Sequence, residues 1–183
     1  FTEEEVRKFG AGIYYDSYEK FGAHPAVEAG ITGVHFAVWA PDAMRVSVVG
    51  DFNFWDGRRH QMKKRGPSGI YEIFIPGLKP GTIYKYEIKT KAGLPMLKAD
   101  PYGNFAELRP NTASVVWDMS GYQWNDGAWI KEREAAKDRL KDSPMSIYEV
   151  HLGSWMQKPV AQDENGVDIN GSQFYNYREA AEK

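Results

Sequence analysis

The sequence predicts an all-β fold, an antiparallel β-sandwich, followed by a linker helix and the opening of a βα unit. Short segments with strand periodicity, separated by glycine and proline, fill the region up to Trp117, which is typical of an antiparallel sandwich. Helical periodicity begins after Trp117. A nearly continuous apolar run then follows, of the kind that is buried on both faces in a parallel sheet.

The composition is that of a soluble globular protein. Of the 183 residues, 42% are hydrophobic and 26% are charged, and the net charge is −2. The longest basic cluster, Lys63-Lys64-Arg65, is too short to follow a phosphate backbone, so no nucleic-acid partner is expected. The sequence has no cysteine, which excludes disulfides and thiolate chemistry and fits a reducing compartment. It also lacks a bilayer-spanning apolar run and a signal-peptide pattern, so a cytoplasmic protein without membrane contact is predicted.

The chain is expected to begin with a lead-in segment over residues 1–25. Thr2 and Glu5 have the spacing of a capping box, which predicts a short helix over residues 3–9 that ends at Gly10 and Gly12.

The sandwich is predicted to span residues 26–118. From Gly33 the residues alternate, so that Val34, Phe36 and Val38 lie on one face of a strand until Pro41 interrupts it. The fourth strand alternates in the same way, with Tyr84 and Tyr86 on its buried face. Glycine and proline turns separate most of the segments. After the first strand, the predicted strands are residues 45–49, 70–75, 82–89, 94–98 and 113–117.

Helix and strand patterns after the sandwich predict a linker over residues 119–143 and a second region over residues 144–183. Asp126 can cap a helix over residues 128–141 with an apolar stripe at Trp129, Ala136 and Leu140. The sequence then predicts a strand over residues 147–152, a polar loop over 157–171 and a helix over 174–183. A single βα unit cannot bury its own surface, so this region should be less ordered than the sandwich. The start at Phe1 and the end at Lys183 indicate a piece of a longer chain.

Most catalytic and metal-binding motifs are absent from the sequence. Asp163 to Asp168 superficially resembles a calcium loop, but its glycine comes early and Phe174 stands where a bidentate glutamate is required, so a solvated loop is favoured. Glu149 and His151 lie on one side of the predicted strand and could form an acid–base pair, although a structural hydrogen bond is the favoured interpretation. No cofactor, metal or catalytic residue is predicted.

The cluster from Asp51 to Gly57 is the most informative candidate site. It places three aromatic side chains among amide and carboxylate groups directly after a strand. A sugar ring has apolar C–H faces and a polar hydroxyl rim, so its binding site combines a flat aromatic surface with hydrogen-bonding groups at the edge. The alternative is that Trp55 folds back into the sandwich, which residue type alone favours.

Several motifs together resemble a known family. They are Phe36-Ala37-Val38-Trp39-Ala40-Pro41, Val46 to Asn53, Trp55-Asp56-Gly57, Pro80-Gly81, Tyr84-Lys85-Tyr86-Glu87 and Lys98-Ala99-Asp100-Pro101-Tyr102. This region is similar to the family 48 carbohydrate-binding module of bacterial glycogen branching enzymes. Phe21 to Pro25 and Ser146 to Trp155 extend the resemblance over nearly the whole chain. The run His151-Leu152-Gly153-Ser154-Trp155 favours branching enzymes over debranching enzymes or a separate glycogen-binding subunit.

The resemblance implies an immunoglobulin-like sandwich followed by the first strand and helix of a truncated (β/α)8 barrel of glycoside hydrolase family 13. The family's full-length enzymes cut an α-1,4-glucan and rejoin the fragment through an α-1,6 bond, which requires two carboxylates about 5 Å apart. The motifs that carry those carboxylates do not occur here, so this chain alone is expected to be inactive. The implied partners are an α-1,4-glucan or glycogen and the missing catalytic barrel.

The resemblance also implies a substrate-binding site. The tryptophan and lysine that contact sugar in glycogen-binding members match Trp55 and Lys85, with Asn53 beside them. A second aromatic residue, expected near Ala92 to Pro95, is missing. Two alternatives remain: a module that itself holds glycogen, and a protein-interaction domain, which would show an exposed apolar patch instead of an aromatic and polar surface.

Overall fold

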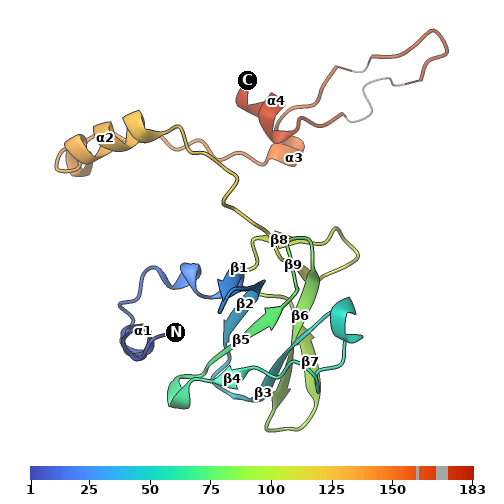
Figure 1. Cartoon of the computed structure of the whole chain (residues 1–183). Helices are drawn as coiled ribbons and strands as arrows, with labels where there is room; N and C mark the ends of the chain where they lie inside the picture. Colours follow the sequence, from blue (N-terminus) through green and yellow to red (C-terminus); the bar gives the residue numbers. More distant parts are fainter. Residues whose placement is uncertain (160, 168–172) are drawn as a thin grey trace. The chain divides into compact units, whose positions relative to one another are not determined.

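A computed structural model describes residues 1–159, 161–167 and 173–183 of the chain (Figure 1). These residues form two compact units, Phe1–Gln123 and Trp124–Lys183. The described helices include none that is both long enough and apolar enough to cross a membrane.

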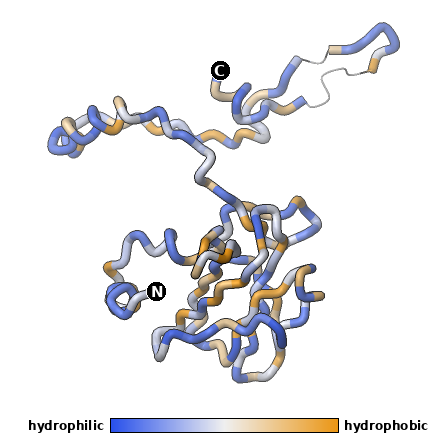
Figure 2. The backbone as a smooth tube through the Cα atoms, viewed as in Figure 1, coloured by the Kyte–Doolittle hydropathy of each residue, from blue (hydrophilic) through white to orange (hydrophobic). Residues whose placement is uncertain are grey.

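The first unit is a sandwich of antiparallel strands, which confirms the predicted all-β fold (Figure 1). One sheet has the order β1-β2-β5-β4, and the other has the order β3-β6-β9-β8 with β7 paired to β6. The strands are β1 (Gly22–Glu28), β2 (Ile31–Trp39), β3 (Ala43–Val49), β4 (Lys63–Lys64), β5 (Ile70–Pro76), β6 (Ile83–Thr90), β7 (Pro95–Lys98), β8 (Phe105–Ala106) and β9 (Ser114–Val115). Figure 2 shows hydrophobic stretches along these strands, interrupted by hydrophilic residues.

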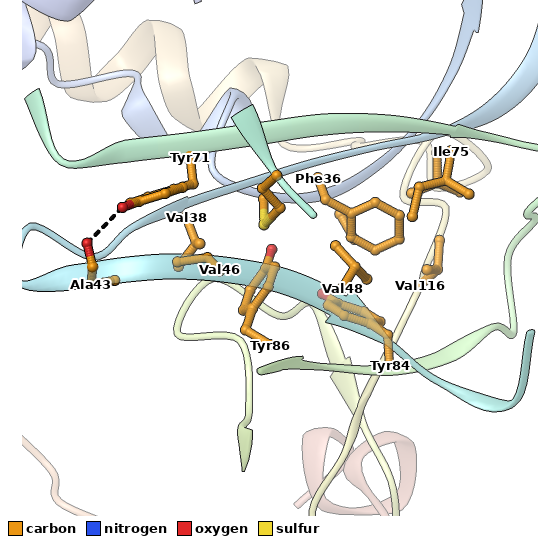
Figure 3. Packing of buried hydrophobic residues seen from close by; sticks show 13 residues of the cluster. Phe36, Val38, Ala43, Val46, Val48, Tyr71, Ile75, Tyr84, Tyr86 and Val116 are labelled. Carbon is orange, nitrogen blue, oxygen red and sulfur yellow. Dashed lines mark hydrogen bonds between the residues drawn. The ribbon is translucent and has the colours of Figure 1, made fainter. Parts of the chain in front are cut away.

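The core between the sheets is built by the predicted alternation (Figure 3). Phe36 and Val38 of β2 face Val48 of β3 and Tyr86 of β6, and all four side chains are almost completely buried. Full burial of one such side chain stabilises a fold by about 1.5–3 kcal/mol. The opposite face of β2 contributes Ala37 to a smaller cluster under the N-terminal segment.

A buried polar group lies within this core. The Asp100 side chain accepts hydrogen bonds from Tyr84 Oη at 2.7 Å, from Tyr86 Oη at 3.0 Å and from the backbone N–H of Tyr102 at 2.8 Å. Burial raises the pKa of the Asp100 carboxyl, while these hydrogen bonds oppose the rise. Because Tyr86 Oη also lies 3.3 Å from the carbonyl of Ala37, this network joins β6 to the other sheet.

The N-terminal segment contains one confirmed element and one that the sequence did not predict. Helix α1 (Glu3–Gly10) has the predicted capping box between Thr2 and Glu5. Strand β1 was missed, and it crosses the expected domain boundary at residue 26. Its residues alternate weakly and include Pro25, which a strand tolerates at a sheet edge, and β1 is an edge strand.

The second unit contains short helices: α2 (Gly127–Ala136), α3 (Leu152–Trp155) and α4 (Tyr177–Ala181). Helix α2 ends earlier than predicted, and the Asp126 side chain makes no capping hydrogen bond. Helix α4 lies within the helix predicted over 174–183, and the Asn176 side chain caps its first turn.

The strand predicted over residues 147–152 is not formed. Residues 147–150 have no regular secondary structure, and Ile147 and Tyr148 are 81% and 76% exposed. A strand is stabilised by hydrogen bonds to a neighbouring strand, and the only β-pairing between described residues of this unit is the isolated bridge of Gln157 and Phe174. The prediction of a strand was therefore wrong: Leu152 begins helix α3, and no described part of the chain pairs with residues 147–151.

Candidate functional site

The predicted site lies on a loop that follows β3 and covers the outer face of its sheet. Ser47 points outward, because its neighbours Val46 and Val48 point into the core. The Ser47 hydroxyl donates to the carbonyl of Gly57 at 2.6 Å, and Ser47 is completely buried. The loop also returns alongside β3, since the N–H of Val48 donates to the carbonyl of His60 at 3.0 Å.

Asn53 holds this loop together from inside. Its Oδ1 accepts from the N–H of Gly50 at 3.0 Å, and its Nδ2 donates to the carbonyl of Val48 and to His60 Nδ1, each at 2.9 Å. The side chain is completely buried, so no amide atom is left to meet a ligand. The expectation that Asn53 contacts sugar is therefore corrected: a buried side chain that makes three hydrogen bonds within the loop is a positioning group.

Trp55 does not enter the core of the sandwich. Its ring is half-buried on the loop, and Nε1 donates to Asp51 Oδ1 at 2.8 Å. The aromatic residue of the loop that packs against the core is Phe52. The alternative in which Trp55 fills the sandwich is thus wrong, because Phe52 occupies that role and leaves Trp55 partly at the surface.

Lys85 lies near the start of the same loop. It pairs with Val49, the last residue of β3, and its side chain points away from the core because Tyr84 and Tyr86 point into it. The Lys85 Nζ donates to Thr112 Oγ1 at 2.8 Å. Lys85 and the loop therefore share the outer face of one sheet.

The loop root also borders a shallow hollow of about 260 Å³. Asp51 and Phe52 line one side, and Gly81, Thr82 and Ile83, with Leu78, line the other. Carboxylate, hydroxyl and apolar groups thus lie together beside the loop, which is the mixture that binding a sugar requires.

The other candidate motifs of the sequence can be located in the described parts of the chain. Within them, no three histidine, aspartate or glutamate side chains converge as metal ligands would. His151 Nδ1 lies 2.9 Å from Ser154 Oγ, and Glu149 is exposed outside any strand, so the proposed acid–base geometry is not formed. Asp163 accepts from the N–H groups of Asn165 and Val167, as in a solvated turn, and Asp168 lies outside the described residues.

One feature of the loop was missed from the sequence. Phe54 is 81% exposed and has a left-handed backbone with φ of 60°, and Trp55 follows with φ of 59°. Non-glycine residues rarely adopt this conformation, and no residue pattern in the loop predicts it.

Known proteins share sequence with this chain. Residues 20–103 match the family described as "Carbohydrate-binding module 48 (Isoamylase N-terminal domain)". The whole chain is 53% identical to the 1,4-alpha-glucan branching enzyme GlgB of Rubrobacter xylanophilus over 183 residues, which is 23% of that protein. It is 52% identical to GlgB of a Synechococcus strain, with 96% of this chain and 24% of that protein covered.

Among solved structures, a putative alpha amylase from Salmonella typhimurium matches with 26% identity and a TM-score of 0.45, covering 60% of this chain and 16% of that one. The chain spans about a quarter of the length of the branching enzymes it matches. Residues 20–103 are therefore similar to the carbohydrate-binding module 48 family, in a chain whose sequence is similar to bacterial 1,4-alpha-glucan branching enzymes along its whole length.

Proposed function

We propose that this chain supplies the glucan-binding module of a 1,4-alpha-glucan branching enzyme and that Trp55 and Lys85 contact the glucan. The observation that carries the proposal is the half-buried Trp55 ring, held by Asp51 on an outer sheet face that also presents Lys85. An aromatic ring can pack on the C–H face of a glucose residue, while ammonium and carboxylate groups hydrogen-bond to its hydroxyls.

The full-length protein is proposed to be the enzyme. It would cut an α-1,4-glucan and transfer the fragment to form an α-1,6 branch, a retaining reaction that needs a nucleophilic carboxylate and a carboxylic acid about 5 Å apart. These groups are assigned to the remaining three quarters of the protein, on the basis of the length of the relatives. The 183-residue chain is accordingly expected to form no branches in an assay with amylose.

The second proposed partner is the rest of the enzyme itself. Residues 144–183 are proposed as the beginning of a catalytic barrel, with residues 119–143 as the linker.

The first unit also presents an apolar surface: Phe105 and Trp117 stack at 4.7 Å between ring centroids, and both rings are about half exposed. Leu108, three residues after Phe105, is 89% exposed. We assign this surface to packing against the missing barrel, because apolar side chains grouped in this way usually mark an interface.

An NMR titration with maltoheptaose tests the binding proposal directly. The indole N–H signals of the six tryptophans report separately, and Trp129 in the second unit is an internal control. Saturable shifts at Trp55 without shifts at Trp129 are expected, and Trp55→Ala should abolish saturation. No response from wild-type chain at millimolar sugar would refute the proposal and leave the module with a packing role only. The cytoplasmic location stays a prediction.

A further inference from the structure

The backbone of Phe54 is in a conformation that its side chain disfavours. A short 3₁₀ turn, Asp51–Asn53, ends at Phe54, and the N–H of Trp55 then closes the turn by donating to the carbonyl of Gly50 at 2.9 Å. The left-handed residue that ends such a turn is usually glycine or asparagine. A phenylalanine there costs about 1 kcal/mol or more, and Trp55 repeats the same cost one residue later.

This conformation turns the Phe54 ring into solvent. The side chain is 81% exposed and belongs to neither core cluster, so packing does not account for it. A strained residue whose side chain packs into neither core cluster is a candidate for a functional contact. Glycine would close the same turn without strain and without exposing an apolar ring.

Arg59 lies beside this ring. Its guanidinium carbon is 5.5 Å from the centroid of Phe54. The neighbouring Arg58 is bound to the carboxylate of Asp56 by two hydrogen bonds of 2.9 and 2.8 Å, whereas Arg59 forms no salt bridge with any described residue. The guanidinium lies over the ring, and its N–H groups are free to donate to a ligand bound there.

We infer that Phe54 and Arg59 form a second glucose contact of the module, with the ring against the C–H face of a sugar and the guanidinium donating to its hydroxyls. This inference rests on the proposed function and adds a contact that is independent of Trp55 and Lys85. The contact also provides an aromatic surface that is absent from the turn near Ala92 to Pro95. The Phe54 ring is also more exposed than the half-buried Trp55 ring.

The test separates stability from binding in the full 183-residue chain. Phe54→Gly and Phe54→Asn both suit the left-handed backbone, so each variant should unfold at the same temperature as wild type or a higher one. Each should nevertheless raise the Kd for maltoheptaose about fivefold, as expected for the loss of one aromatic contact. Phe54→Tyr should bind within about twofold of wild type, because the ring is kept.

Two controls sharpen the result. Tyr15 is also 81% exposed, so Tyr15→Gly removes an equally exposed ring and should leave the Kd unchanged. Arg59→Gln should weaken binding, whereas Arg58→Gln should not. If wild type binds and both Phe54→Gly and Phe54→Asn bind equally well, this inference is overturned while the proposed function stands. If wild type itself shows no binding, both are overturned.

Discussion

Asn53 Nδ2 lies 2.9 Å from His60 Nδ1, and this hydrogen bond joins the two ends of the loop segment between these residues. Since the amide donates, the imidazole accepts, which requires a neutral ring. Burial lowers the pKa of His60, and the positive charge of Arg59 lowers it further. The surface that carries Trp55 is therefore held in place by the buried Asn53, the half-buried His60 and the neutral state of the His60 ring.

Replacing Asn53 should destabilise the first unit. Asn53→Ala leaves the N–H of Gly50 and the carbonyl of Val48 without their partner, and a buried unsatisfied group costs about 1–3 kcal/mol. We expect the free energy of unfolding to fall by about 2 kcal/mol in urea denaturation. Asn104→Ala, at an exposed position, is the control and should be neutral within about 0.5 kcal/mol. A neutral result for Asn53→Ala would contradict the positioning role.

The stability that His60 gives to the folded chain should decrease as the pH falls. The ordinary pKa of 6.5 applies to His60 in the unfolded chain, and the pKa in the folded state is lower. Between these two pKa values the unfolded chain binds a proton at His60 that the folded chain does not. The contribution of His60 to the free energy of unfolding is therefore complete above pH 6.5 and is lost as the pH falls through the folded pKa. The unfolding free energy of wild type minus that of His60→Gln, measured from about pH 8 to about pH 5, should therefore decrease on acidification. A difference independent of pH would exclude this linkage.

The sequence predicts the sandwich well because alternation reports burial directly. Val34, Phe36 and Val38 lie in the core as expected, since a strand with one buried face must alternate. The weakly patterned β1 was missed, because edge pairing to β2 and not its own residues makes it a strand. The strand expected over residues 147–152 is absent for the opposite reason. Its residues suit a strand, but none of residues 1–159, 161–167 and 173–183 forms a strand that pairs with it.

The candidate site was predicted only in part. Residue type and motif identify the loop, Trp55 and Lys85, but they do not say which way each side chain turns. Asn53 points inward and Phe54 outward, and this difference depends on a left-handed backbone at Phe54 that hydrogen bonds to Gly50 and Asp51 impose. Backbone conformation of this kind is set by three-dimensional contacts and has no signature in a single sequence.

The buried Asp100 network should contribute strongly to stability. Asp100→Ala removes the acceptor shared by the hydroxyls of Tyr84 and Tyr86 and also the acceptor of the Tyr102 N–H. The expected loss is about 2–3 kcal/mol in the free energy of unfolding, because each buried donor left unpaired is costly. Asp42→Ala, at an exposed aspartate, should change the same quantity by less than about 0.5 kcal/mol. Equal effects of the two substitutions would mean that the network is energetically unimportant.

Gly50 is the residue at which the loop leaves β3, and its lack of a side chain is required there. A β-carbon at Gly50 would collide with the backbone carbonyl oxygen of Ile83, which cannot move without distorting β6. Gly50→Ala should therefore lower the free energy of unfolding by about 1–3 kcal/mol, as overpacking does. Gly121→Ala is the matched control, since no atom lies within 4 Å of its added β-carbon, and it should be neutral. Because Gly50 also donates to Asn53 and accepts from Trp55, the substitution should weaken maltoheptaose binding as well. Loss of stability with unchanged affinity would show that the glucan contacts do not depend on the root of the loop.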